Sequence, residues 1–512
     1  MFQSIRYSFS LLRAGRTLAA YDALLTPEQI DQLPWAARLL LSIAKVGARK
    51  PPKGDANPVA TALSSLGPSY IKLGQFLATR PDLVGPQRAF DLKALQDRLP
   101  PFPMAEARNI IRRNLGADVD TLFVEFGPPV AAASIAQVHK ARSPDGRELA
   151  VKVLRPGVDK RFAADLGSFY FAARLMERFS AEGRRLRPVA AVQMLEQSMK
   201  QELDLRMEAA ALSEMAENTR DDPGFRVPKV DWERTSREVL TTQWIDGTPI
   251  SDVESLRAQG FDLVKLGDTV IQSFLRHAIR DGFFHADMHQ GNLFIDRAGN
   301  LVAVDFGIVG RLGRDESRFL AEILYGFITR NYLRVSEVHF EAGYVPRTHD
   351  PAVFAQAIRA IGEPIMDRAA NQISMARLLT QLFEVTAQFD MQTQPQLLLL
   401  QKTMVVVEGV ARTLNPNLNM WVTAEPVVRT WIERKLGPAG RLEDASMTLA
   451  GLFAGLPAML GEAQRATTLL ASMAARGGLQ PDRARERHGR WTQVWLALGA
   501  VSLAAIAFSL LT

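Results

Sequence analysis

The sequence predicts an α+β fold that follows a helical extension and ends in a transmembrane helix. Helical patterns dominate before Phe123, where short β segments begin. From Arg318 to Leu436 the pattern is again mostly helical, so strands and helices are segregated along the chain, as they are in α+β folds. The final segment, Trp491–Thr512, has 22 residues and no charged side chain. As a helix it is long enough to cross a bilayer.

The N-terminal residues Met1–Leu24 have the pattern of an amphipathic helix with arginines among apolar side chains. The absence of acidic residues before Asp22 also fits a mitochondrial transit peptide. We favour a helix of the mature protein that lies in a membrane interface. A second helix over Leu33–Val46 and a linker at Lys50–Gly54 are expected to follow.

A third helix is expected to begin at Pro68, because proline suits the first helical turn. Lys72 and Gln75 are three residues apart and therefore share one face. Gly74 lies between them and lowers helix propensity by about 1 kcal/mol relative to alanine. A glycine at this place indicates close packing. Considered alone, however, the Lys72–Gln75 face is typical of solvated surface.

A helix over Phe102–Leu115 is expected to end at Gly116, a common C-cap residue. Two strands then follow, at Ile135–Ala141 and Glu148–Leu154. The segment Ser143–Gly146 between them has the composition of a tight turn. This part of the chain therefore predicts a β-hairpin.

Lys152 lies in the second of these strands, between Val151 and Val153. A buried lysine requires an anionic partner. The next predicted helix, Met199–Glu217, carries Glu202, Asp204 and Glu208. Asp204 and Glu208 are four residues apart and would share a face. One acidic side chain of this helix is expected to meet Lys152, and the residues alone do not decide between them.

A strand over Trp232–Trp244, a turn at Asp246–Pro249 and a helix over Leu263–Asp281 are predicted next. That helix leads to the polar segment His285–Asn292. After Gly307 a new helix is expected from about Asp315, which leaves no room for a long connecting segment.

Three polar residues in this region have a distinctive spacing. Asp287 and Asn292 are five residues apart, and Asp305 follows thirteen residues later and precedes Phe306 and Gly307. Carboxylate and amide oxygens are preferred ligands of Mg²⁺, and a further carboxylate can accept a proton or orient a nucleophile. The spacing resembles the catalytic and magnesium loops of protein kinases.

A different kind of metal site is also conceivable at the same place. His285, Asp287 and His289 could supply the two histidines and one carboxylate of a non-haem iron centre. That interpretation leaves Asn292 and the Asp305-containing motif without a role, so we favour the kinase-like interpretation.

Composition restricts the function further. The net charge is +6 and the chain has no cysteine, which excludes disulfides and thiolate metal sites. No basic stripe with interleaved aromatic residues is present, so no nucleic-acid partner is expected. Several arginines just before Trp491 and the tryptophans at the start of Trp491–Thr512 are typical of a membrane boundary. The positive-inside rule then keeps the preceding chain cytoplasmic. The glycine-interrupted apolar segment Ala445–Leu460 is expected to lie on the membrane.

Together these motifs resemble the UbiB family of atypical kinase-like ATPases, over most of Met1–Leu436. The resemblance implies a bilobal kinase-like fold and a role in ubiquinone biosynthesis. It rests on five motifs in order: Lys72-Leu73-Gly74-Gln75, Ala131-Ala132-Ala133-Ser134, Val151-Lys152-Val153, Glu202-Leu203-Asp204, and the His285–Asn292 loop with Asp305-Phe306-Gly307.

The resemblance also implies roles for single residues. Lys152 would bind ATP phosphates, Asn292 and Asp305 would hold Mg²⁺, and Asp287 would be the catalytic carboxylate. A nucleotide-covering segment would comprise Val130, Ala131, Ala132, Ala133, Ser134, Ile135, Ala136, Gln137 and Val138. Alanine is disfavoured at positive φ, so this segment cannot fold over phosphates as a glycine-rich loop does.

The helix with Lys72 and Gln75 would lie over the place where a peptide docks in ordinary kinases, facing Glu202 and Asp204, and act as a gate. Glu208 would be the partner of Lys152, with Glu202 as the alternative. The implied domains are a helical extension (1–117), a kinase-like domain (118–436, with its small lobe about 118–247 and its large lobe about 248–436), an amphipathic linker (437–490) and the transmembrane helix (491–512).

The implied function is a membrane-anchored ATPase that handles lipid quinone precursors, with ATP and Mg²⁺ as cofactors and other ubiquinone-biosynthesis proteins as possible partners. A protein kinase that regulates those proteins is the main alternative. A quinone-precursor hydroxylase would need a flavin or iron site. The implied location is a bacterial inner membrane, or a mitochondrial inner membrane if the source is eukaryotic.

Overall fold

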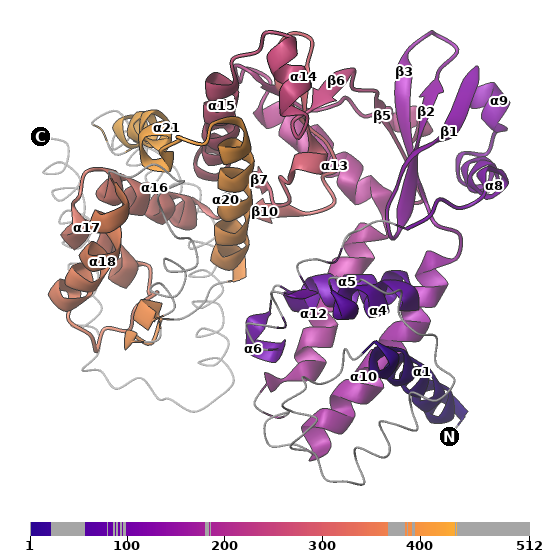
Figure 1. Cartoon of the computed structure of the whole chain (residues 1–512), viewed down its shortest axis with the longest axis horizontal. Helices are drawn as coiled ribbons and strands as arrows, with labels where there is room; N and C mark the ends of the chain where they lie inside the picture. The colour runs from indigo at the N-terminus through magenta and orange to yellow at the C-terminus, as the bar shows by residue number, and fades with distance from the viewer. Residues whose placement is uncertain are drawn as a thin grey trace, which may run out of the picture. The chain divides into compact units, whose positions relative to one another are not determined.

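The protein is described from a computed structural model of the whole chain (Figure 1). The structure describes residues 2–21, 57–78, 80–84, 99–179, 186–366, 384–386, 388–391 and 395–435, with isolated positions between these ranges. The elements up to Ile432 form one compact unit, and Glu433 begins a second.

The N-terminal extension contains α1 (Phe2–Ala20), α4 (Pro58–Leu66), α5 (Pro68–Ala78) and α6 (Pro81–Val84). The side chain of Asn57 accepts a hydrogen bond from the backbone N–H of Ala60 and caps α4. The helix expected at Pro68 is confirmed as α5. The close packing expected at Gly74 is also confirmed, since a Cβ there would lie 2.4 Å from a methyl carbon of Leu95.

Helix α1 packs against α4 and α10 (Val158–Phe179). Ala14 and Ala19 are buried, whereas Phe9 is 74% exposed and Leu12 is 69% exposed. The predicted amphipathic helix is therefore present, and part of its apolar surface is used by the protein itself. Its place in a membrane interface stays a prediction.

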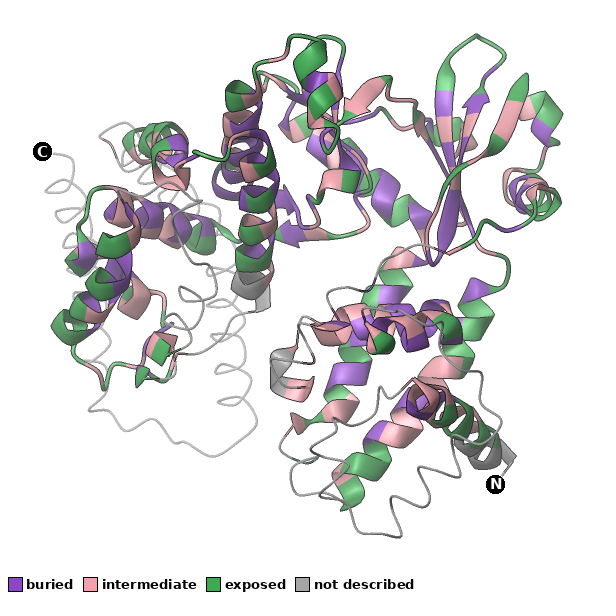
Figure 2. Cartoon of the chain, in the orientation of Figure 1, coloured by how far each residue is buried: buried purple, intermediate pink, exposed green. Residues whose placement is uncertain are grey.

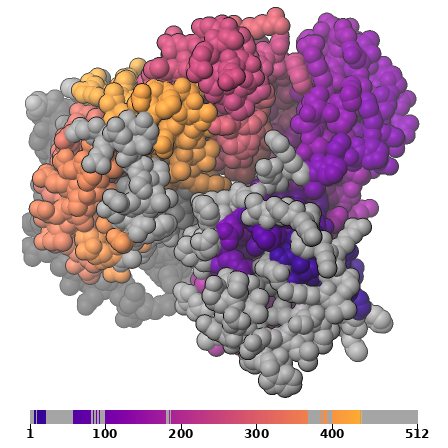
Figure 3. All heavy atoms as spheres, viewed as in Figure 1, coloured from indigo at the N-terminus to yellow at the C-terminus, as the bar shows by residue number. Residues whose placement is uncertain are grey.

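A four-stranded antiparallel sheet follows, with the strand order β1-β2-β3-β5. Its strands are β1 (Glu125–Ala132), β2 (Ala136–Arg142), β3 (Glu148–Leu154) and β5 (Val239–Gln243). Helices α8 (Met104–Leu115) and α9 (Val119–Leu122) pack on it through a buried apolar cluster. The hairpin was predicted to within one residue, and the left-handed conformation of Gly116 confirms the expected C-cap. In Figure 3 the atoms of these residues appear in violet at the upper right.

The predicted helix Met199–Glu217 is wrong as a single helix. It is split into the end of α12 (Pro188–Glu202) and α13 (Leu205–Asn218). Asp204 is the N-cap of α13 and accepts from Arg206 N. The backbone N–H of Leu205 donates to Arg237 O at 2.9 Å, so a contact distant in sequence stabilises the break.

The remaining strands form two small sheets, in the orders β10-β7 and β4-β9-β8-β6. These strands are β4 (Phe225–Arg226), β6 (Gly247–Pro249), β7 (Phe283–His285), β8 (Leu293–Asp296), β9 (Leu301–Ala303) and β10 (Val309–Arg311). The helices of this part are α14 (Val253–Ala258), α15 (Leu263–Arg276), α16 (Arg314–Ile328), α17 (Tyr332–Glu341), α18 (Pro351–Met366), α20 (Pro395–Leu414) and α21 (Met420–Lys435), with shorter turns η1 (Trp232–Arg234), η2 (His277–Asp281) and η3 (Gln290–Asn292). Among the described residues, the mostly helical character expected after Arg318 is confirmed.

Two predictions between Trp232 and Pro249 are wrong in part. The expected strand Trp232–Trp244 begins as the short helical turn η1, and only Val239–Gln243 is a strand. Thr235 explains this, because its hydroxyl donates to Asp231 O and accepts from Thr241 N, and such local bonds compete with a ladder. The expected turn at Asp246–Pro249 includes strand β6, which pairs with β8.

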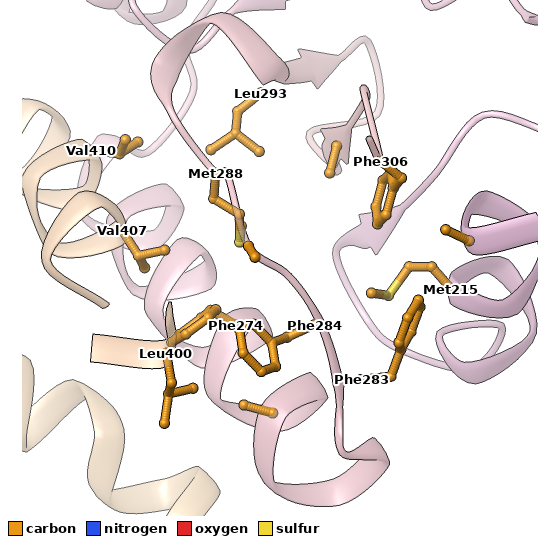
Figure 4. Close-up of a cluster of buried hydrophobic side chains, with 14 of the residues drawn as sticks. Met215, Phe274, Phe283, Phe284, Met288, Leu293, Phe306, Leu400, Val407 and Val410 are labelled. Carbon is orange, nitrogen blue, oxygen red and sulfur yellow. The ribbon is translucent and has the colours of Figure 1, made fainter. Parts of the chain in front are cut away.

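The predicted helix Leu263–Asp281 is confirmed as α15, although its last turn, His277–Asp281, is a π-helix. Large apolar side chains of α15, β7 and α20 pack beneath the segment that follows β7 (Figure 4). Phe274, Phe284 and Met288 are each 1% exposed, and buried residues line the inner faces of these elements (Figure 2). The polar segment is therefore supported by the main core.

Several expected segments lie outside the described residues. These are Leu33–Val46, Lys50–Gly54, Ala445–Leu460 and the predicted transmembrane helix Trp491–Thr512. Within the part of the chain that is described, no helix combines the length and apolar character needed to cross a membrane.

Candidate nucleotide and magnesium site

Lys152 is the central cation of the candidate site. It lies in β3, opposite Val138 on one side and Leu240 on the other. Its Nζ donates to both carboxylate oxygens of Glu208, at 3.0 and 2.9 Å, and to Asp305 Oδ1 at 3.0 Å. The Lys152 side chain is 16% exposed. The partner left open by the residues is therefore Glu208 and not Glu202.

Burial and the charges of the neighbouring groups shift the pKa values of Lys152, Glu208 and Asp305. Burial raises the pKa of Glu208 to about 7, although the Lys152 ammonium pulls it down. Burial also opposes ionisation of Asp305, but Lys152 outweighs it and holds the pKa of Asp305 well below its usual range. Burial alone would lower the pKa of Lys152, yet the two carboxylates raise it above its ordinary value. Lys152 therefore remains charged at neutral pH.

The segment after β7 is ordered by His285. Its Nε2 donates to Val304 O at 3.1 Å, and its Nδ1 accepts from the Asp287 backbone N–H at 3.1 Å. Burial lowers the pKa of His285, so the ring is neutral. The ring therefore ties the backbone of Asp287 to the strand that precedes Asp305.

These bonds show that the iron interpretation is wrong. Both nitrogens of His285 are used by the backbone, and Nδ1 of His289 accepts from Gly291 N at 3.0 Å. Only His289 Nε2 approaches Asp287, at 3.8 Å. Among the described residues, no group of three or more histidine, aspartate or glutamate side chains could hold a metal ion.

Asn292 and Asp305 lie on two loops that a backbone hydrogen bond joins. The amide of Asn292 donates to Asp287 O at 3.0 Å, which leaves Oδ1 as its acceptor atom. The backbone N–H of Val304 donates to Asn292 O at 2.9 Å, so the two loops are held together. A carboxylate and an amide oxygen are a suitable donor set for Mg²⁺ bound to phosphates. The residues therefore fit a magnesium ion.

Asp305 adopts a strained backbone conformation. Its φ is +62°, in the left-handed region that non-glycine residues rarely adopt. A Cβ on Gly307 would lie 3.3 Å from Asp305 Oδ1, so glycine leaves space beside the carboxylate. Phe306 is buried and its ring lies 4.5 Å from that of His285. Such strain is characteristic of functional positions.

The expected nucleotide-covering segment is a short turn and not an open loop. Val130–Ala132 belong to β1, Ala136–Val138 belong to β2, and the backbone N–H of Ala133 donates to Ala136 O at 2.8 Å. Ile135, Ala136 and Gln137 are buried. Val130 and Ala131 are exposed, whereas Ala132, Ala133 and Val138 are half-buried. That this segment covers the nucleotide stays a prediction.

The side chain of Gln137 is bonded to the segment before α8 and to His139. Its Oε1 accepts from Phe102 N at 2.9 Å, and its Nε2 donates to Phe102 O at 3.3 Å and to His139 Nε2 at 2.9 Å. His139 Nδ1 in turn donates to Gly127 O at 2.9 Å. The amide is fully engaged, so Gln137 joins the residues before α8 to the sheet.

Arg155 was missed by sequence reasoning. Its guanidinium donates to Ala133 O, through Nε at 3.0 Å and Nη2 at 2.8 Å, and to Pro100 O at 2.8 Å. It thus joins the turn after β1 to the end of the extension. Its position just after β3 and before Pro156 gave no signal of this, because the acceptors are backbone carbonyls far away in sequence.

The extension approaches the site through α5. Lys72 Nζ lies 2.6 Å from Glu202 Oε2, and both side chains are nearly buried, at 11% and 10% exposed. The ion pair predicted for these residues is therefore present. Burial raises the pKa of Asp305, Lys152 lowers it most, and the charge of Lys72 lowers it further. Gln75 is half-buried one turn further along α5.

Asp204 does not face Lys72 as expected. Its carboxylate binds the Arg206 guanidinium, with Oδ1 2.9 Å from Nε and Oδ2 2.7 Å from Nη2. Asp204 therefore caps α13. Of the two carboxylates expected to face Lys72, Glu202 is the one that forms an ion pair with it.

Helix α20 also supports the catalytic segment. Thr403 Oγ1 donates to Ala286 O at 3.1 Å, and Gln290 Nε2 donates to Thr413 Oγ1 at 2.9 Å. Neither threonine carried a sequence signal, since each lies more than a hundred residues after its partner.

Comparisons with known proteins agree with this geometry. Residues 94–339 match the ABC1 atypical kinase-like domain, and residues 358–419 match the UbiB helical domain. A relative from Marinobacter nauticus, named "Probable protein kinase UbiB", is 40% identical over 436 residues, which cover 84% of this chain and 80% of the relative. A relative of the same name from Pseudomonas paraeruginosa is 39% identical, covering 84% of this chain and 82% of its own.

A solved structure is also similar. It is the complex of Rv3197 with erythromycin from Mycobacterium tuberculosis, with a TM-score of 0.50 and 24% identity, covering 77% of this chain and 97% of the other. At this identity the likeness supports the kinase-like fold alone.

Proposed function

Because this chain belongs to the UbiB family of atypical kinase-like proteins, we propose that it is an Mg²⁺-dependent ATPase at the bacterial inner membrane that supports ubiquinone biosynthesis. One observation carries the ATPase part. Lys152 bonds simultaneously to Glu208 and Asp305, and the Asp305 loop is joined to the loop of Asp287 and Asn292.

Each residue in this arrangement has a distinct task. Lys152 is placed to bind phosphate oxygens, and Glu208 holds its ammonium group in position. Asn292 and Asp305 would hold Mg²⁺, which would neutralise phosphate charge when bound. Asp287 is 38% exposed, so its carboxylate is accessible to orient a nucleophile or accept its proton.

The turn after β1 would cover the nucleotide. Ala133 O is held by Arg155, and the surface residues Val130–Ala132 are in strand conformation. This turn is short and bound to its neighbours, so it would act as a fixed edge of the site. A flexible glycine-rich flap would behave differently.

The membrane part of the proposal rests on Trp491–Thr512, which would anchor the chain with the catalytic domain in the cytoplasm. ATP turnover would then help to present or extract lipid quinone precursors for other biosynthetic proteins. Lys72 and Gln75, on α5, would gate access to the site.

A protein kinase acting on those proteins is the second candidate, favoured by the printed name of the relatives. Against it, β10 ends at Arg311 and α16 begins at Arg314. That connection leaves no place for the extended segment on which peptide substrates dock. A hydroxylase lacks support, because the histidines of the supposed iron site bind backbone atoms.

The test is an ATP-turnover assay of the full chain, with and without quinone-precursor lipids and anionic vesicles. If the lipids stimulate ATP hydrolysis and no phosphoryl group is transferred to protein, the proposal is supported. If a phosphoryl group is transferred to a protein and no free phosphate is released, the kinase is favoured. Truncation at Pro481 should release the folded core to the soluble fraction. Unchanged membrane retention would overturn the tail-anchor proposal.

A further inference from the structure

A polar cavity lies between the N-terminal extension and α10, outside the nucleotide site. Its volume is about 280 Å³, and it is lined by residues of α1, α4, α5 and α10. The polar side chains in its wall are Ser10, Arg13, Tyr70, Arg161 and Asp165. These helices contact one another in pairs, α1 with α4 and α10, and α5 with α10 (Figure 1). The cavity is therefore formed where the extension packs on α10.

The cavity carries excess positive charge. Two guanidiniums and one carboxylate give its wall a net charge of +1. Arg161 donates one hydrogen bond to Leu66 O at 2.8 Å, and the described residues offer neither arginine an ion pair within 4 Å. Guanidinium groups bind carboxylates and phosphates through several parallel N–H donors, so this pair is equipped for an oxyanion.

The neutral groups add donors to the same space. Tyr70 is buried and its hydroxyl interacts with Ser10. Burial raises the pKa of Tyr70, so the hydroxyl keeps its proton at neutral pH. Gly67 has a φ of +104°, and a Cβ there would lie 2.4 Å from Arg161 Nη2. Glycine thus leaves space for the Arg161 guanidinium beside Leu66 O.

We propose that this cavity binds the phosphate group of a small phosphate ester, with Arg13 and Arg161 as the binding cations and the Tyr70 hydroxyl as a donor. The volume is close to the lower limit of about 300 Å³ for small-molecule sites. Asp165 reduces the positive charge of the cavity and so limits its affinity for a bare phosphate ion.

The site would also regulate the gate. Tyr70 lies on α5, two residues before Lys72. A ligand that joins α1, α5 and α10 stabilises the docked extension, and linkage requires that docking strengthens ligand binding equally. This regulatory step rests on the proposed function, whereas phosphate binding does not.

Calorimetric titration of the full chain with inorganic phosphate, without nucleotide, tests the binding step. Arg13→Gln should weaken binding about tenfold or more, because it removes a charged hydrogen bond. Asp165→Asn should strengthen it several-fold. Arg16→Gln, with the same charge change on the same helix outside the cavity, should leave affinity unchanged. Equal phosphate affinity in the parent, Arg13→Gln and Asp165→Asn would overturn the proposal, because binding would then lie elsewhere, for example in the nucleotide site.

The source of the phosphate ester is resolved by two further titrations. Glycerol 3-phosphate represents a soluble ester, and phosphatidylglycerol vesicles present the same group as a lipid headgroup. If either one binds in a manner that depends on Arg13, the proposed site is supported and the source of the phosphate ester is identified. If neither binds in an Arg13-dependent manner, the ester proposal fails even if ATP hydrolysis proceeds as proposed.

Discussion

Two lysine–carboxylate contacts with similar burial lie in different parts of the molecule. Lys152 and Glu208 join the sheet to α13 and are 16% and 8% exposed. Lys72 and Glu202 join the extension to the end of α12 and are 11% and 10% exposed. Lys152 has a second carboxylate partner, Asp305, and Asp305 belongs to the loop expected to hold Mg²⁺. The Lys72 contact uses a carboxylate outside that loop.

This difference indicates that the Lys152 contact serves nucleotide binding and that the Lys72 contact serves access to the site. A nucleotide would bring phosphate oxygens to Lys152 and Mg²⁺ to Asp305, so the contact between these two residues must adjust during each cycle. The Lys72–Glu202 pair can persist throughout, and it restrains α5 beside the site. Nearly buried ion pairs lose more when one partner is removed than exposed pairs do. The two contacts can therefore be broken one at a time.

The largest effect is expected for Asp305→Asn. The substitution removes a charged Mg²⁺ ligand and a partner of Lys152, so ATP turnover should fall by at least about 10²-fold. Asp287→Asn should also reduce turnover strongly but spare most of the affinity for Mg²⁺-ATP. Thermal shift with Mg²⁺-ATP, measured beside turnover, separates the two. Equal loss of binding in both variants would contradict the division of roles.

The second prediction concerns the extension. Lys72→Ala should free α5 and raise ATP turnover several-fold, and Glu202→Ala should do the same, because each removes the same contact. The double variant should differ from the sum of the single effects by a coupling energy of about 0.5–3 kcal/mol. Lys200→Ala, which removes an exposed lysine from α12, is the control. Parental turnover and nucleotide affinity in both single variants would show that the gate does not exist.

The site could be predicted from the sequence because its residues have the spacing of the catalytic and magnesium loops of protein kinases. Between Asn292 and Asp305 the chain forms only the short hairpin of β8 and β9, which local sequence patterns define well. Lys152 was found for a similar reason, since a lysine between valines in a hairpin is unusual. Its choice of Glu208 over Glu202 could not be decided, because it depends on the break between α12 and α13.

That break and the other errors have a common cause. Neither glycine nor proline marks Leu203-Asp204, and the break is stabilised by the bond from Leu205 N to Arg237 O. Gln137 matched a motif expected to cover the nucleotide, yet its amide binds the backbone of Phe102. Contacts to backbone atoms far away in the chain leave no pattern in one sequence, and they decided each of these cases.

Arg155 allows a third, smaller test of how the extension meets the kinase-like domain. Arg155→Lys keeps the charge but loses the planar fork that reaches Ala133 O and Pro100 O together. We expect a loss of about 1–2 kcal/mol in the free energy of unfolding and weaker ATP binding. Urea unfolding and nucleotide titration measure the two effects. Arg142→Lys, at the exposed end of β2, is the matched control, and an equal loss there would remove the special role of Arg155.

The last prediction is a pH dependence that only the Lys152 site should have. The pKa of Glu208 is about 7 in the folded protein, against about 4.3 for an unperturbed glutamate. The folded protein therefore binds a proton that the unfolded chain releases, and this contribution is complete below about pH 4 and lost as pH rises through about 7. Asp305 does not change the pH dependence above about pH 5, because its pKa is lowered and it is ionised in both states.

Relative to Glu208→Gln, the parent should thus lose free energy of unfolding between about pH 5 and about pH 7.5, by at most about 3 kcal/mol. Urea unfolding at several pH values checks this, with Glu233→Gln at an exposed position as the control. Parallel pH profiles for the parent and Glu208→Gln would mean that Lys152 fully compensates the burial of Glu208, and the two lysine contacts would then differ only in their partners.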